Sequence, residues 1–157
     1  MTAVVGVLCK NGVVIGTDSS ATFGPQACRT IEQPTEKIEI IDSHVIVAGS
    51  GAIGLGQRFC AIVKQAWAAK LFQQGSALET CRKLCASTVK DFSETAARKG
   101  DYSAVLAFHC DAGYQLCEFD QDTLQPELKT ASMVCLYWQR RADHGPIPCT
   151  HERGVLG

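Results

Sequence analysis

Two short stretches carry residue types that could do chemistry. Residues 49–54, GSGAIG, follow the apolar run HVIVA and match the pattern G-x-G-x-x-G letter for letter. That pattern is typical of a strand, a glycine turn and a helix whose N-terminus faces a pyrophosphate, so it predicts a dinucleotide site. The other stretch is the N-terminus, where Thr2 follows the initiator methionine.

Thr2 becomes a candidate nucleophile once Met1 is removed, as is routine before a small residue. The threonine then carries both a hydroxyl and a free α-amine. A hydroxyl needs a base to take its proton, and an N-terminal amine with a pKa of about 7.7 to 8.0 can be that base. Because many proteins begin with Met-Thr, this feature indicates little until its surroundings are considered.

The elements that must position these residues follow from the hydrophobic pattern. The β-branched runs TAVVGVLC and GVVIGTD flank Asn11-Gly12 and predict a hairpin. After a loop with Gly24 and Pro25, KIEIID and HVIVAG predict a second hairpin around Asp42-Ser43. A third hairpin is expected from YSAVLAFHC and YQLCEFD, around residues 111–113.

Two helices are expected between the second and third hairpins. Apolar residues recur at helical spacing from Ala52 to about Gln73, and Gly75 ends that segment. Ser76, with Glu79 three residues later, predicts a capping box that starts the second helix.

This order of elements disfavours a dinucleotide fold, in which strands and helices alternate and the glycines follow the first strand. Here the glycines follow a fourth strand that lies within hairpins. The acidic residue expected about 20 positions after the glycines is absent, because Gln73 and Gln74 occupy that region. A dinucleotide-binding module is therefore the least favoured alternative.

Composition limits the partners. The chain has 157 residues, 46% hydrophobic and 20% charged, with a formal net charge of -1, which is typical of one globular domain. That charge favours neither nucleic acid nor membranes as partners. No run reaches the roughly 18 apolar residues of a membrane span, and no signal peptide opens the chain, so we expect a cytoplasmic protein.

The nine cysteines and four histidines do not indicate a metal site. The cysteines lack the paired C-x-x-C spacing of a zinc site, and Cys81 and Cys85 share one helix face. We expect reduced, mostly buried thiols that act as small hydrophobes. His44 and His109 are expected at strand ends.

The stretches TAVVGVLCKNGVVIGTDSSAT, EKIEIID and VAGSGAIG together resemble the proteasome β-type subunits, which are N-terminal-nucleophile threonine peptidases. The resemblance runs from Thr2 to about residue 130 and is greatest to short bacterial proteasome-like homologues that need no propeptide. It implies an α+β fold, a four-layer αββα sandwich, C-terminally truncated here. It also implies a homo-oligomeric ring, a peptide or unfolded-protein substrate, and no cofactor; an unfolding ATPase as a further partner is left open.

The resemblance assigns the catalytic roles. Thr2 is the nucleophile, Lys37 matches the lysine whose charge lowers the pKa of Thr2, and Asp18 matches the carboxylate that pairs with this lysine. A buried lysine without such a partner would tend to lose its charge. Without the family pattern, Asp18 would be interpreted as a turn residue and Lys37 as a solvated charge on a strand.

The resemblance also gives the glycine stretch a different chemistry. The amide of Gly49 matches the donor to the oxyanion of the tetrahedral intermediate, and a glycine lets the backbone approach the substrate. Gly51 and Gly54 are then interpreted as close packing at the helix start.

Substrate contacts follow in the same way. Ser20, Ala21 and Thr22 match the strand segment that pairs with an extended substrate peptide. Val47 matches the floor of the primary specificity pocket, where a small apolar residue suggests apolar substrate side chains. Ser20 departs from the arginine often found at its position.

Residues 1–130 are thus expected to form an incomplete N-terminal-nucleophile domain, and residues 131–157 a tail outside the family pattern. The tail shows neither strand nor helix periodicity. Back-translation with a shift of one base recovers Ser-Ile-Gly-Ser-Gly and Ala-Leu-Met-Arg-Glu-Val-Phe-Trp, which leads to the hypothesis of a frameshift shortly after residue 130. The alternative to an active peptidase is therefore an inactive or truncated family member, with a structural role or none.

Overall fold

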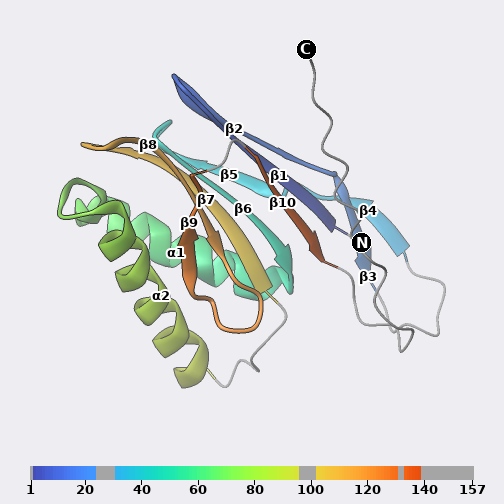
Figure 1. Ribbon diagram of the computed structural model, residues 1–157. Coiled ribbons are helices and arrows are strands. Elements are labelled where there is room, and N and C mark those ends of the chain that lie inside the picture. The colour runs from blue at the N-terminus through green and yellow to red at the C-terminus, as the bar shows by residue number, and fades with distance from the viewer. Residues whose placement is uncertain (1, 24–30, 96–101, 131–132, 139–157) are drawn as a thin grey trace, which may run out of the picture.

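The computed structural model describes residues 2–23, 31–95, 102–130 and 133–138 (Figure 1). In chain order their elements are β1 (Thr2–Cys9), β2 (Gly12–Thr17), β3 (Ser20–Phe23), β4 (Ile31–Pro34), β5 (Ile38–Ile41), β6 (Val45–Gly51), α1 (Ile53–Ala68), the 3₁₀ helix η1 (Leu71–Gln73), α2 (Ala77–Glu94), β7 (Tyr102–Cys110), β8 (Gly113–Phe119), β9 (Pro126–Leu128) and β10 (Met133–Trp138). The loop with Gly24 and Pro25 lies outside the described residues.

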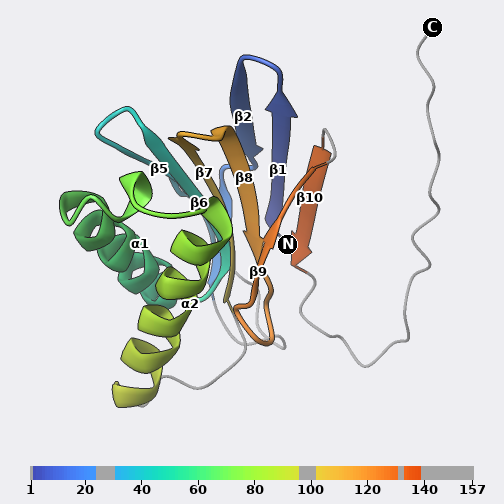
Figure 2. The ribbon, with the colours of Figure 1, turned by 60° about the vertical axis from the view of Figure 1, so that its left-hand side comes forward.

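The described elements form three layers. A five-stranded antiparallel sheet has the order β5-β6-β7-β8-β9, and a three-stranded antiparallel sheet has the order β10-β1-β2. Helices α1 and α2 cover one face of the five-stranded sheet, and the three-stranded sheet covers the other (Figure 2). Strands β3 and β4 pair only with each other in the described part of the chain.

The three expected hairpins are confirmed. Cys9 pairs with Gly12 across the first turn, Ile41 with Val45 across the second, and Cys110 with Gly113 across the third. The second turn places Asp42 and Ser43 at positive φ, 47° and 58°. These left-handed conformations match the twist of the flanking strands.

The first helix ends earlier than its periodicity predicts. Helix α1 stops at Ala68, Lys70 adopts a left-handed φ of 58°, and η1 follows. Apolar spacing continues through this break because Phe72 still packs into the same core as the helix. The start of α2 is as expected, since Ser76 Oγ accepts a hydrogen bond of 3.2 Å from the Glu79 amide.

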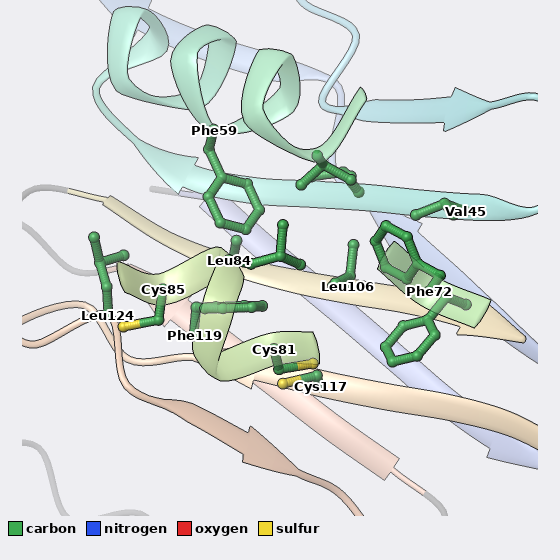
Figure 3. Close-up of a cluster of buried hydrophobic side chains, with 14 of the residues drawn as sticks. Val45, Phe59, Phe72, Cys81, Leu84, Cys85, Leu106, Cys117, Phe119 and Leu124 are labelled. Atoms are coloured by element: carbon green, nitrogen blue, oxygen red, sulfur yellow. The ribbon is translucent and has the colours of Figure 1, made fainter. Parts of the chain in front are cut away.

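The larger core, which we call the helix-side core, lies between the helices and the five-stranded sheet (Figure 3). Its aromatic rings meet edge to face, with centroids 5.1 Å apart for both Phe59–Phe119 and Phe72–Phe108. Such pairs add to the stabilisation from burial. Its main buried side chains are Val45, Val47, Phe59, Val63, Phe72, Leu84, Leu106, Phe108 and Phe119.

The expectation of reduced, buried thiols is confirmed for the described core. Cys81, Cys85, Cys110 and Cys117 are free and buried, whereas Cys9 is free and exposed. Cys81 and Cys117 lie against each other (Figure 3), and the hydrogen bond between them, together with burial, raises the pKa of the Cys117 thiol. The Cys117 thiol therefore stays protonated, and the buried cysteines serve as packing groups.

A smaller inter-sheet core joins the two sheets. Its fully buried members are Val4, Ala48, Val105, Ala107 and Leu116. Gly6 lies at the closest approach, because a Cβ there would lie 3.1 Å from Leu116 Cδ1. A side chain at Gly6 would therefore press on Leu116.

The C-terminal expectations need a correction. Residues 133–138 were expected to lack strand character, but they form β10 and pair antiparallel with β1, with Val5 opposite Cys135. An apolar run can add to an open strand edge through its backbone alone, without alternating side chains. Residues 139–157 lie outside the described part, and the frameshift stays a hypothesis.

The outer face of the three-stranded sheet carries no helix in the described residues (Figure 2). Val14 on this face is 63% exposed. The described part of the chain is therefore a three-layer αββ arrangement rather than the expected four layers.

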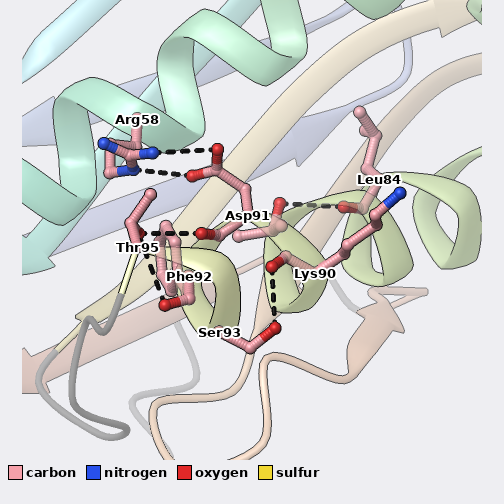
Figure 4. Close-up of polar contacts among 8 residues, drawn as sticks. Arg58, Leu84, Lys90, Asp91, Phe92, Ser93 and Thr95 are labelled. Carbon is pink, nitrogen blue, oxygen red and sulfur yellow. Dashed lines mark hydrogen bonds and ion pairs between the residues drawn. The ribbon is translucent and has the colours of Figure 1, made fainter.

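An ion pair joins the two helices (Figure 4). Arg58 of α1 donates from Nε to Asp91 Oδ2 of α2 over 2.6 Å and from Nη2 to Oδ1 over 3.0 Å. The Arg58 guanidinium holds the pKa of the Asp91 carboxyl below its usual value.

Neither this pair of helices nor any other described helix has a stretch long and apolar enough to cross a bilayer.

Candidate active site

Asp18 connects the candidate lysine to the start of the chain. Its Oδ2 accepts a hydrogen bond of 2.7 Å from Lys37 Nζ, and its Oδ1 accepts one of 2.8 Å from the Ala3 amide. The Asp18 amide in turn donates to the Ala3 carbonyl over 3.2 Å. One carboxylate therefore joins the lysine charge to the residue next to Thr2.

Burial rules out the simpler interpretation of Lys37. Its side chain is only 8% exposed, against 31% for Asp18. A solvated strand charge would not be buried to this extent, and a buried ammonium group needs a partner such as this carboxylate. The contact also explains Asp18, which lies directly after β2 and is held by β1 through Ala3.

The register of β5 and β6 brings Lys37 to the glycine stretch. Ile38, the first residue of β5, pairs with Ala48, so Lys37 and Gly49 are the next residues along the chain on either side of this pair. The register of β5 ends at Ala48, whereas β7 continues beside Gly49, Ser50 and Gly51. Among the described strands, none pairs with β6 beyond Ala48 on the side of β5.

Thr2 is the first described residue, and its backbone opens β1 opposite Trp138. Its side chain lies outside what the structure describes, as does Met1. The hydrogen bonds of Ala3 nevertheless fix the backbone one residue away. The arrangement places the Lys37 ammonium group and the Asp18 carboxylate near the start of β1.

The glycines of residues 49–56 have different structural reasons. A Cβ at Gly49 would lie 2.5 Å from Tyr102 Oη, and one at Gly56 would lie 3.2 Å from Tyr102 Cε2. Gly51 has a φ of 123°, which a residue with a side chain rarely adopts. The close packing expected of Gly54 is wrong, because a Cβ there would meet nothing within 4 Å.

Tyr102 is the residue near this stretch that sequence analysis missed. It is 4% exposed, and burial raises the pKa of its hydroxyl well above the usual value, so it stays a neutral phenol. Its sequence position, at the start of an ordinary strand, gives no signal. The spacing of Gly49 and Gly56 could have suggested a large neighbour, but not which one.

The substrate-binding candidates belong to two different sheets. Ser20, Ala21 and Thr22 form most of β3, which pairs with β4 and leaves its other edge without a described strand. The side chain of Val47 lies in the helix-side core and is 1% exposed. The pocket role of Val47 and the pairing role of β3 stay predictions.

Lys64, which lies on α1, provides a contrast to Lys37. Lys64 pairs with Glu39, lowers the pKa of that carboxyl, and is 54% exposed. Beside them, burial and a hydrogen bond with Glu39 raise the pKa of Cys60 to about 12. Glu39 and Lys64 thus form a partly exposed ion pair between β5 and α1.

The described residues can also be compared with a metal site and with a dinucleotide fold. No cluster of three or more potential metal ligands occurs in the described residues. His44 lies directly before β6, stacked on Trp67, and His109 lies near the end of β7, as expected. The strands flanking α1 and α2, β6 and β7, are antiparallel neighbours, whereas a dinucleotide fold requires a parallel crossover.

Comparison with known proteins agrees with the sequence resemblance. The profile of the family described as "Proteasome subunit" matches residues 2–129. Over 53 residues, the chain is 40% identical to proteasome subunit beta 1 of Thermococcus sibiricus, 42% to that of Thermococcus gammatolerans and 36% to that of Thermococcus kodakarensis. These alignments cover 34% of the chain and 24 to 25% of the relatives' lengths, so the chain is compared with only part of each relative. With the family match across most of its length, the chain belongs to the proteasome subunit family.

Proposed function

We propose that this chain is a threonine-type endopeptidase subunit whose nucleophile is Thr2, exposed by removal of Met1. The observation that carries the proposal is the contact of Asp18 with both Lys37 and the Ala3 amide. This contact holds a buried, paired lysine beside the residue that follows the nucleophile. Family membership supports the same assignment.

In the proposed reaction the Thr2 hydroxyl attacks the carbonyl carbon of a peptide bond. The α-amine accepts the hydroxyl proton, and the Lys37 charge favours the deprotonated oxygen. The Gly49 amide stabilises the oxyanion of the tetrahedral intermediate. The amine then gives the proton to the leaving nitrogen, and water hydrolyses the ester formed on Thr2.

The substrate would be an extended peptide or unfolded protein segment. It would lie beside β3, at Ser20, Ala21 and Thr22, and beside the open end of β6. Both edges lack a described strand partner and can offer backbone hydrogen bonds to an added strand. The side chain before the scissile bond would face Val47.

We also propose that the functional form is a homo-oligomeric ring, as the resemblance to proteasome β-type subunits implies. Sedimentation velocity on the full chain would test this. A sole species of about 17 kDa would contradict it.

A family member without activity is the second candidate. The family match over residues 2–129 shows membership and not turnover, so it is compatible with this candidate. Such a chain would keep the Asp18–Lys37 pair but would not turn over peptides. The same experiments separate the two candidates.

The test compares the full chain with Thr2→Ala and Thr2→Ser. The parent should hydrolyse a fluorogenic peptide, and intact mass should show loss of Met1 and a single adduct at Thr2 after treatment with an electrophilic peptide. Thr2→Ala should lose at least about 10³-fold in kcat/KM, while Thr2→Ser, which keeps a hydroxyl, retains measurable turnover. Turnover by Thr2→Ala equal to the parent would remove Thr2 from the mechanism.

A further inference from the structure

The ring of Tyr102 lies between two pieces of backbone at the junction of β6 and α1. Tyr102 pairs with Gly51 across β6 and β7, and Gly49 lies two residues along β6 from that partner. An ideal Cβ at Gly49 would lie 2.5 Å from Tyr102 Oη and 2.7 Å from Cε2, and one at Gly56 would lie 3.2 Å from Cε2. The phenol therefore occupies the space that side chains at both glycines would fill.

On one side this junction is held by the sheet, where Gly49, Ser50 and Gly51 pair with Ala104, Ser103 and Tyr102 of β7. Strand β5 begins opposite Ala48 and does not pair with Gly49 in the described register. Helix α1 starts without a side-chain cap at Ala52, after the positive φ of Gly51. Tyr102 itself is well anchored, since it is 4% exposed and its ring lies 5.7 Å from that of Phe59.

We infer that Tyr102 is a positioning residue whose ring sets the place of the Gly49 backbone amide relative to the nucleophile. The inference rests on the proposed function, in which this amide faces the oxyanion. A Cβ at Gly49 would overlap the ring, so the ring packs closely over this residue, and removing the ring would free the Gly49 backbone to shift toward the space it leaves. An oxyanion donor displaced by a fraction of an ångström to one ångström loses much of its effect.

Two glycines of α1 provide a matched pair of variants. Gly56→Ala places a methyl group 3.2 Å from Tyr102 Cε2, so the ring must give way, while alanine favours the helix. Gly54→Ala makes the same change two residues earlier, where nothing lies within 4 Å. Both variants should fold, because both replace glycine by a better helix former.

A second pair changes the ring itself. Tyr102→Leu removes the ring and Tyr102→Phe keeps it, while Phe72→Leu removes an aromatic ring from the same core away from Gly49. The readouts are kcat and KM for a fluorogenic peptide and the rate at which a peptide vinyl sulfone labels Thr2. In that labelling the Thr2 oxygen bonds to the β-carbon of the sulfone and a proton is taken up at the α-carbon, so no carbonyl oxyanion forms.

Tyr102→Leu should lower kcat by about 10- to 100-fold and Gly56→Ala by about 3- to 10-fold. KM and the labelling rate should stay within about threefold of the parent, because the nucleophile is unchanged. Tyr102→Phe, Gly54→Ala and Phe72→Leu should stay within about threefold in every readout. A loss in Phe72→Leu equal to that in Tyr102→Leu, or a parallel fall in labelling, would overturn the inference.

Amide hydrogen exchange at Gly49 tests the contact without activity. Tyr102→Leu and Gly56→Ala should raise the Gly49 exchange rate by about tenfold or more, and the three control variants should not. If the parent hydrolyses no peptide, the proposed function fails while this exchange result still decides whether Tyr102 holds the amide. Unchanged exchange in both Tyr102→Leu and Gly56→Ala would overturn the inference.

Discussion

The two faces of the five-stranded sheet are built differently. Among the side chains that the structure describes, nineteen buried residues form the helix-side core, with aromatic rings packed edge to face, and five form the inter-sheet core. The helix side carries the partly exposed ion pair of Arg58 and Asp91, whereas in the pair of Asp18 and Lys37 the lysine side chain is buried.

This difference separates stability from chemistry. The helix-side core packs α1 and α2 against the sheet, and the inter-sheet core includes Val4 of β1, two residues from Thr2. Tyr102 belongs to the large core yet contacts Gly49, so it links the two sides. The following variants test how far the separation holds.

The largest expected effect is on the candidate site. Lys37→Ala should lower kcat/KM for a fluorogenic peptide by about 10³-fold, because the Thr2 oxygen loses the charge that stabilises it. Lys64→Ala removes an exposed lysine from the helix-side rim and should stay within about twofold. Equal losses in the two variants would show that net charge, rather than position, matters.

Two fully buried valines compare the cores directly. Val4 lies in the inter-sheet core and Val63 in the helix-side core, both 0% exposed. Truncation to alanine should lower the free energy of unfolding by about 2 kcal/mol in each, since the same two methyl groups are removed. Only Val4→Ala, two residues from Thr2, should also lower kcat. Denaturant unfolding and peptide assays measure both, and equal activity of the variants would contradict the separation.

Two of the glycines of the three-stranded sheet, Gly6 and Gly16, test its two faces. Gly6→Ala adds a methyl group 3.1 Å from Leu116 Cδ1 and should lower the free energy of unfolding by about 1 kcal/mol. Gly16→Ala, with nothing within 4 Å, should be neutral or stabilising. Denaturant unfolding of both variants checks this. A larger loss in Gly16→Ala would mean that the outer face of the sheet is packed in solution.

The smallest expected effect concerns the exposed pair of Arg58 and Asp91. The pKa of Asp91 is lower in the folded state than in the unfolded state. The stabilisation by its charge is therefore fully present above the unfolded-state pKa of about 4, and it is lost as the pH falls through the lower pKa of the folded state. Asp91→Asn should reduce Tm by a few degrees at most near pH 6, and by less near pH 3. Scanning calorimetry at both pH values measures this, and a difference that grows toward pH 3 would contradict the assigned direction.

Local patterns determined much of this protein. Two turns and the start of α2 could be predicted because their signals act within a few residues. These signals are Asn11-Gly12, Asp42-Ser43 and Ser76 with Glu79. The joint occurrence of the stretches around Thr2, Asp18, Lys37 and Gly49 was enough to indicate the proteasome family, and the match over residues 2–129 agrees.

Tertiary structure decided what lies between distant residues. The pairing of Asp18 with Lys37 was expected from the family resemblance, but only the fold shows that Asp18 also accepts a hydrogen bond from the Ala3 amide. Only the fold shows that Tyr102 lies against Gly49 and Gly56, because these contacts join residues far apart in sequence. It also decided that residues 133–138 pair with β1, since an open strand edge accepts a backbone without regard to side-chain periodicity. Side-chain pattern specifies which face of an element is buried, but the partner on that face is chosen by the packing of the whole chain.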